Sequence, residues 1–233
     1  MHFLDVKGPV RQIEVLHNGQ VSETIRITRD GRSASITQTA DKTFKGQLTY
    51  DPARRRLDYV YSGAEGKGST VTLFSEQWCV LRIEDTPAPG SGFPATVTVN
   101  QCDSKGRLVT TEVKLATGKL VGKTTYRWAP DGLSAVETTN STTGNETRQA
   151  RYDRQGRFVS DSTLHDEGIQ SATTVTFRDD ARGNWLERRM VTKTTRPCAP
   201  DPYLAKTMAK YGLKCEPDPE PITDVDQRRI LYY

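Results

Sequence analysis

The sequence predicts an all-β fold: an extended, curved antiparallel meander of hairpins with one short helical insertion near the C-terminus. Apolar residues alternate with polar ones over short runs, which is the pattern of half-buried antiparallel strands. Turn sequences such as Asn18-Gly19 and Asp30-Gly31 separate the runs and supply the positive φ angles that tight hairpins need. The 233 residues include 30 threonines, and stiff β-branched side chains favour strands. We expect a single domain over residues 1–233.

The expected strands follow this alternation along the chain. Apolar residues on alternate positions flank each turn, as the two strands of a hairpin require. In chain order the flanking residues are Ile13, Val15, Val21, Ile25, Ile27 and Ile36; Leu57, Tyr59, Tyr61, Val71 and Leu73; Val97 and Val99; Tyr126 and Trp128; and Val175, Phe177 and Trp185.

Several turns share one pattern: an aromatic residue, Asp, two variable residues, Gly, Arg or Asn, and an apolar residue. The clearest copy is Tyr-Asp-Arg-Gln-Gly-Arg-Phe at 152–158, and residues 102–108 fit the same frame. The copy at 50–57 lacks its Gly, the one at 177–185 is longer, and the one at 128–133 is shorter. In such a turn Asp can accept from nearby backbone N–H groups, and Gly can take the left-handed conformation.

The copy at 152–158 resembles the YD repeat of bacterial RHS-type proteins. Residues 6–13 are similar to the start of small secreted bacterial proteins that carry degenerate YD-like repeats. This resemblance implies an extended, meandering antiparallel sheet over about residues 6–195, since the copies recur at a spacing typical of repeat architectures. It brings no catalytic residues, and a chain this short cannot form the encapsulating shell of large RHS proteins.

The C-terminal part has a different composition. Residues 196–221 hold six of the twelve prolines. Within them, 201–212 predicts a short helix with Asp201 as N-cap, Pro202 in the first turn and Gly212 at the end. Residues 222–233 predict a last strand, so the helix would lie in an insertion between the final two strands.

The four cysteines predict two disulfides. Cys79 and Cys102 are symmetric about the loop 87–94, so a hairpin closed by that loop would place them opposite each other. Cys198 and Cys215 bracket a segment of 16 residues, and bridging it would stabilise the fold by about 3 kcal/mol. Disulfides indicate an oxidising compartment, so we expect a periplasmic or secreted protein whose signal peptide was removed. The alternative is four free thiols in a cytosolic protein.

Composition excludes several classes of protein. No run approaches 18 apolar residues, which argues against a membrane-spanning helix, and a net charge of +4 is too balanced to indicate a nucleic-acid partner. The glycine-rich 63–70 segment lacks the Ser or Thr that should follow Lys67 in a phosphate-binding loop. His165-Asp166-Glu167 is more typical of a surface turn than of a metal site. We expect no catalytic residues, metal or cofactor.

The remaining features favour binding. A thin sheet buries little core and exposes broad faces, which suits an interaction protein better than an enzyme. The main hypothesis is a non-enzymatic extracytoplasmic bacterial protein that binds a protein or polymer partner through its sheet face and loops. One alternative is an immunity or inhibitor protein that neutralises a secreted toxin, and another is an envelope-polymer hydrolase. The expected contact elements are the insertion and the tips at 63–69 and 87–94, with Tyr203, Lys206, Lys210, Tyr211, Trp78, Trp128 and Trp185 as candidate partner-binding residues.

Overall fold

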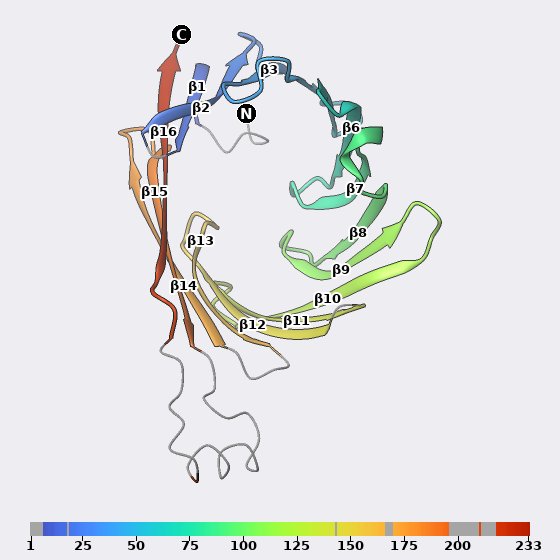
Figure 1. Cartoon of the computed structure of the whole chain (residues 1–233), viewed down its shortest axis with the longest axis vertical. Coiled ribbons are helices and arrows are strands. Elements are labelled where there is room, and N and C mark those ends of the chain that lie inside the picture. The colour runs from blue at the N-terminus through green and yellow to red at the C-terminus, as the bar shows by residue number, and fades with distance from the viewer. Residues whose placement is uncertain (1–6, 18, 143, 166–169, 196–209, 211–217) are drawn as a thin grey trace. The chain divides into compact units, whose positions relative to one another are not determined.

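The chain folds into sixteen β-strands in the computed structural model, which describes residues 7–17, 19–142, 144–165, 170–195, 210 and 218–233. Figure 1 labels most of the strands and colours the chain from blue at the N-terminus to red at the C-terminus. Their bounds are β1 Val10–His17, β2 Gln20–Ile27, β3 Ser33–Gln38, β4 Lys45–Asp51, β5 Arg56–Gly63, β6 Gly66–Phe74, β7 Val80–Thr86, β8 Thr96–Cys102, β9 Leu108–Leu115, β10 Leu120–Trp128, β11 Ser134–Ser141, β12 Gly144–Tyr152, β13 Phe158–His165, β14 Gln170–Asp179, β15 Trp185–Thr195 and β16 Ile222–Tyr232.

The strand order closes on itself, so the expectation of an open meander is wrong. Each strand is hydrogen-bonded to the next along the chain, and β1 also pairs antiparallel with β16 through residues such as Ile13 opposite Ile230. The fold is therefore a closed, antiparallel, 16-stranded β-barrel. Closure gives the two terminal strands partners for backbone groups that an open sheet would leave exposed at its edges.

Contacts divide the chain into two compact units. The first comprises Met1–Lys123, Phe177–Arg188 and Val225–Tyr233, and the second comprises Thr124–Thr176 and Arg189–Asp224. The expectation of one domain stays a prediction. In the described part of the chain, no helix is long and apolar enough to cross a membrane. Between β7 and β8, Pro89–Ser91 forms one short 3-10 turn.

The hairpin turns owe their shape to aspartate and glycine, as their sequence pattern predicts. Asp103 Oδ1 accepts from the backbone N–H groups of Lys105 and Arg107 at 2.9 Å each, and its Oδ2 accepts from Arg107 Nε at 2.7 Å. Asp153 does the same with Gln155 and Arg157, at 2.9, 2.9 and 2.7 Å. The two turns are thus copies of one structure.

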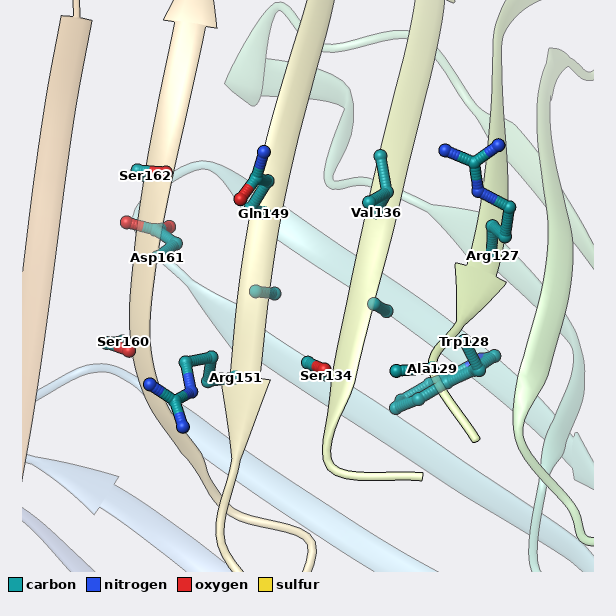
Figure 2. Close-up of a pocket in the computed structure, with 12 residues that line it drawn as sticks. Arg127, Trp128, Ala129, Ser134, Val136, Gln149, Arg151, Ser160, Asp161 and Ser162 are labelled. Atoms are coloured by element: carbon teal, nitrogen blue, oxygen red, sulfur yellow. The ribbon is translucent and has the colours of Figure 1, made fainter. Parts of the chain in front are cut away.

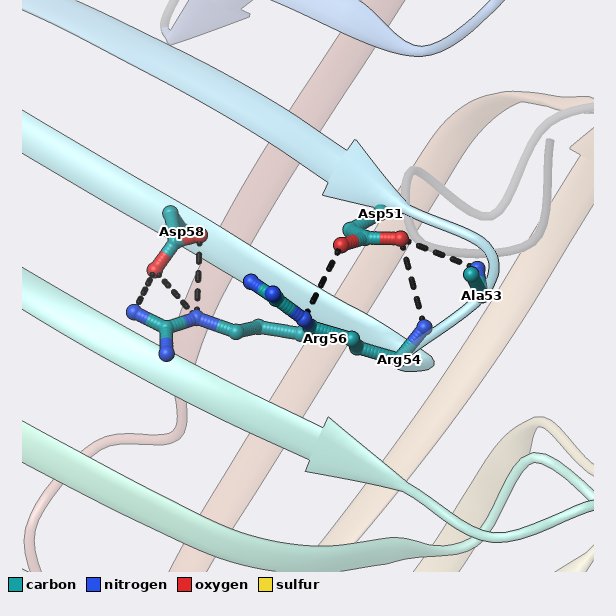
Figure 3. Close-up of polar contacts among 5 residues, drawn as sticks. All are labelled: Asp51, Ala53, Arg54, Arg56 and Asp58. Carbon is teal, nitrogen blue, oxygen red and sulfur yellow. Dashed lines mark hydrogen bonds and ion pairs between the residues drawn. The ribbon is translucent and has the colours of Figure 1, made fainter.

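One turn reaches this shape without glycine. Asp51 accepts from the N–H groups of Ala53 at 2.9 Å and Arg54 at 3.2 Å (Figure 3). Arg55 has a φ of 50°, the left-handed conformation in which the other copies place Gly. A residue with a Cβ takes that conformation at a cost of about 1–2 kcal/mol, so the decayed repeat stores strain at this position.

The first unit has an apolar core on one face of its strands. Alternate residues of β1–β4 meet there because side chains two apart share a face. Facing pairs such as Ile25 with Ile36 and Ala34 with Leu48 extend the core from strand to strand. The buried members are Val10, Ile13, Ile27, Ala34, Ile36 and Leu48.

A disulfide between Cys79 and Cys102 joins the open ends of the β7–β8 hairpin. The register agrees with the symmetry seen in the sequence, since Arg82 lies opposite Val99 and Asp85 opposite Thr96. Cys198, Cys215 and nearly all of the predicted helix at 201–212 lie outside the described residues, so the second bridge and the helical insertion stay predictions.

Candidate functional site

A polar groove of about 650 Å³ lies on strands β10–β13, within the second unit. This β10–β13 groove falls within the roughly 300–1,000 Å³ range of small-molecule sites. The side chains that define it are mostly polar and come from alternate positions on the four strands. They are Arg127, Ser134, Val136, Gln149, Arg151, Ser160 and Ser162, with Trp128 at one end (Figure 2).

Strand register sets the groove residues in two parallel rows. In the first, Gln149 lies opposite Val136 on one side and Ser162 on the other. In the second, Arg151 lies between Ser134 and Ser160 in the same way. Figure 2 shows both rows with their side chains on the same side of the sheet. Residues two apart on a strand share a face, so the hairpin registers alone are enough to build the site.

Arg127 adds a second guanidinium to the first row. Ala129 N–H donates to Ser134 O at 2.9 Å, and counting back two residues from this pair places Arg127 beside Val136. Arg127 and Arg151 are both exposed. Among the described residues neither one has an ion pair or hydrogen-bond partner for its side chain. The groove therefore carries two available positive charges.

The opposite face of the same strands holds a charged cluster centred on Arg148. Arg148 Nε donates to Asp161 Oδ2 at 2.5 Å, and its Nη1 donates to Glu137 Oε2 at 3.4 Å. Tyr152 OH donates to Glu137 Oε1 at 3.0 Å, and the Arg148 guanidinium lies 4.6 Å from the centre of the Phe158 ring. Both carboxylates are thus engaged by one cation, which fits structural pairing rather than acid–base work on a substrate.

The three candidate tryptophans have different surroundings. Trp128 packs against Tyr152, a member of the Arg148 cluster on the face opposite the groove, with ring centres 5.3 Å apart. Trp78 is 41% exposed and contacts Tyr50. Trp185 is only 7% exposed, and the Arg228 guanidinium covers its ring at 3.5 Å. Of the three, only Trp128 lines the β10–β13 groove.

Of the four candidate residues in the insertion, Lys210 is described and exposed, whereas Tyr203, Lys206 and Tyr211 lie outside the described residues. Partner binding by these side chains and by Trp78 stays a prediction.

The two hairpin tips expected to act as separate contact elements pack against each other. Gly90 N–H donates to Glu65 O at 3.0 Å. A Cβ at Gly68 would lie 2.9 Å from the backbone nitrogen of Ala88, so only glycine permits this approach. The glycine-rich segment therefore serves hairpin packing, in agreement with its rejection as a phosphate-binding loop.

Consecutive arginines occur at 54–56, 188–189 and 228–229, and several of them pair with carboxylates. Arg56 contacts Asp58 at 2.7 Å, Arg188 contacts Asp226 at 2.5 Å, and Arg229 lies 3.7 Å from Glu14. Among the described residues, no group of three or more His, Cys, Asp or Glu side chains is placed to hold a metal ion.

A charged ladder occupies one face of β5, β7, β9 and β10 in the first unit. Arg82 pairs with Glu84 at 2.6 Å, and Glu112 pairs with Lys114 and Lys123 at 3.0 Å each. Figure 3 shows the pair at its β5 end, Arg56 with Asp58. Strand register places aliphatic residues of β6 and β8 between these charges. The ladder residues are Arg56, Asp58, Arg82, Glu84, Glu112, Lys114 and Lys123.

Sequence reasoning missed the groove residues other than Trp128. The available signal was the register of each hairpin, but the β12–β13 hairpin contains a β-bulge between Arg151 and Tyr152. Counting outward from its turn would therefore have misplaced Arg151 by one residue.

Comparison of the sequence with protein-family models and with curated proteins finds no match. Comparison of the structures finds a likeness to a porin-like protein from Bacteroides uniformis, with a TM-score of 0.56 at 11% sequence identity, over 97% of this chain and 98% of that chain. A structure of Hsv2 from Kluyvelomyces marxianus also matches at 11% identity, over 77% of this chain and 96% of that one. Its TM-score of 0.18 supports no argument.

The likeness corrects two expectations. The resemblance to small secreted YD-repeat proteins is wrong, because the chain matches a porin-like protein over its full length. The predicted periplasmic or secreted location is also wrong, because a closed antiparallel barrel with an even number of strands is the architecture of bacterial outer-membrane proteins. At 11% identity the likeness concerns the fold: this chain has the fold of a porin-like β-barrel.

Proposed function

We propose that this protein is a non-enzymatic barrel protein of the bacterial outer membrane that binds a partner in its β10–β13 groove. The observation that supports the membrane assignment is the closed order of sixteen strands, shared in fold with a porin-like protein over nearly the whole of both chains. The groove supports binding because its side chains are hydrogen-bonding groups and cations, and the nearest carboxylates are already neutralised by Arg148.

The charged ladder determines which part of the barrel can contact lipid. An Arg or Lys side chain at the bilayer midplane of a barrel costs about 2–4 kcal/mol, falling to about 0–1 kcal/mol near the interface, and an Asp or Glu side chain costs less. Seven charges on one strand face would together make contact with hydrocarbon highly unfavourable. In the proposed arrangement the ladder therefore contacts water or lipid headgroups.

Flotation of the purified full chain with vesicles of lipopolysaccharide and phosphatidylethanolamine tests the membrane assignment. The expected result is that the protein floats with the vesicles through a density gradient. A protein that stays at the bottom of the gradient, with and without vesicles, would overturn the assignment.

A lysine-directed, water-soluble acylating reagent tests the position of the ladder in the same samples. Lys114 and Lys123 should react equally well with and without vesicles, as should Lys119, which lies in the exposed β9–β10 turn and serves as the control. Protection of Lys114 and Lys123 by vesicles, with Lys119 still reactive, would show that the ladder is covered by lipid and contradict the proposed arrangement.

A further inference from the structure

The charge of the β10–β13 groove differs from that of the ladder. In the ladder each cation has a carboxylate partner within 3.0 Å. In the groove, Arg127 and Arg151 project from the face whose other residues are neutral, and the nearby Asp161 is bound by Arg148 on the opposite face. An exposed guanidinium presents several N–H donors in a plane that matches a carboxylate or phosphate. The groove thus favours a ligand with negative charge.

The neutral residues of the groove narrow the ligand further. Ser134, Ser160 and Ser162 present hydroxyl groups that can donate or accept, and Gln149 presents an amide with both functions. These residues follow the two rows across four strands, so their hydrogen-bonding groups repeat along the groove. On this face Val136 is the large apolar side chain of the lining, which leaves little to recognise apolar side chains of a peptide. A hydroxyl-rich ligand fits this surface better than a polypeptide does.

We propose that the β10–β13 groove binds an acidic polysaccharide, with Arg127 and Arg151 holding carboxylate groups of the chain and the serines and Gln149 holding its hydroxyls. This inference rests on the proposed function as a binding protein and names its ligand class. It does not depend on the membrane assignment.

Affinity electrophoresis of the purified full chain tests the inference, with polygalacturonate in the gel as the acidic polysaccharide and dextran as the neutral one. Polygalacturonate should retard the protein and dextran should not. The double substitution Arg127→Gln/Arg151→Gln should weaken binding about 10- to 100-fold, the loss expected when two partly exposed charge-assisted contacts are removed.

The double variant Lys105→Gln/Arg154→Gln is the matched control, because it also removes two positive charges. Both residues are exposed in hairpin turns outside the groove, so this variant should leave the retardation nearly unchanged. A loss as large as that of Arg127→Gln/Arg151→Gln would show that overall charge and not the groove binds the polymer. Wild-type affinity in Arg127→Gln/Arg151→Gln would also overturn the inference.

Competition experiments separate the saccharide from other anions. Inorganic phosphate or polyglutamate should compete with polygalacturonate only at much higher concentrations of charge. Equal competition by phosphate would show that the groove binds anions without recognising a saccharide. Equal competition by polyglutamate would indicate an acidic protein as the ligand. Either result would overturn the inference. Vesicle flotation of Arg127→Gln/Arg151→Gln should match the wild type, so failure of the membrane assignment and failure of the saccharide site are distinguishable.

Discussion

Arg148 Nε donates to Asp161 Oδ2 at 2.5 Å, and this contact joins β12 to β13 on the face opposite the groove. The same guanidinium reaches Glu137 on β11 at 3.4 Å, so three of the groove strands share one cation. A slip of one residue between paired strands turns every side chain to the other face. Because such a slip would remove Gln149 and Arg151 from the groove, the Arg148 cluster acts as its positioning element.

Replacing Arg148 by Met should destabilise the protein, because Glu137 and Asp161 would lose their shared cation while staying about nine-tenths covered. Arg148 itself keeps some contact with solvent, so we expect a loss of about 2–3 kcal/mol in the free energy of unfolding, below the roughly 3–5 kcal/mol typical of fully buried pairs. Denaturant unfolding followed by tryptophan fluorescence measures the change. Arg154→Gln provides the control, and an Arg148→Met midpoint equal to that of the control would contradict the positioning role.

The strain at Arg55 predicts an unusual effect of glycine. Arg55→Gly should raise the free energy of unfolding by about 0.5–1 kcal/mol, because relief of the left-handed conformation outweighs both the added freedom of the unfolded chain and an exposed ion pair with Glu76. Arg54, its neighbour, has a negative φ. Arg54→Gly should therefore lower the stability by about 0.5–1 kcal/mol. Thermal unfolding of the two variants side by side checks the opposite signs, and destabilisation by both would refute the assigned strain.

The disulfide of the β7–β8 hairpin predicts a redox-dependent stability. Cys79 and Cys102 are separated by 23 residues, and a loop of that size contributes about 3 kcal/mol through the unfolded state. The double variant Cys79→Ala/Cys102→Ala should lose about this much stability. A reductant should destabilise the wild type by breaking the same bridge, which the double variant does not contain. Peptide mass mapping without reductant identifies the linked cysteines. Detection of Cys79 and Cys102 as alkylatable thiols would show that the native protein does not contain this disulfide.

The local parts of this fold could be predicted from the sequence, and its closure could not. Asp153 and Gly156 specify a hairpin locally. The Asp153 side chain accepts from backbone N–H groups two and four residues further on, and Gly156 takes the left-handed conformation between them. The pairing of Ile13 with Ile230 joins the two ends of the chain, and a hairpin pattern is the same whether the terminal strands meet or stay apart. Open meander and closed barrel therefore share one sequence pattern, and long-range pairing decides between them.

The groove could not be predicted from the sequence either, because its residues come together through the pairing of separate strands. Sequence reasoning looked for binding residues among tryptophans and loop tips, yet Trp185 is covered by Arg228 and the tips near Glu65 and Gly90 pack on each other. The groove is instead built from serines, Gln149 and two arginines in the middle of strands, where a single sequence gives no sign that they align. Their common face follows from the registers of consecutive hairpins, which the aspartate turns set.

These turn aspartates predict how stability depends on pH. Hydrogen bonds from the Arg107 backbone N–H and guanidinium hold the pKa of Asp103 below its usual value. Partial burial alone would raise the pKa of Asp153, but hydrogen bonds from the Arg157 backbone N–H and guanidinium outweigh it and leave that pKa lowered as well. A carboxyl whose pKa is lower in the folded than in the unfolded chain contributes stability at neutral pH that is lost as the pH falls through the folded pKa.

The free energy of unfolding of the wild type should therefore be constant near neutrality and fall once the pH drops below about 4, the usual aspartate pKa. The double variant Asp103→Asn/Asp153→Asn should be less stable at pH 7. It should lose less stability on acidification, because an asparagine side chain takes up no proton when the chain unfolds. Denaturant unfolding between pH 7 and pH 3 compares the slopes. Parallel curves for the wild type and the double variant would show that these turn carboxylates do not couple folding to protonation.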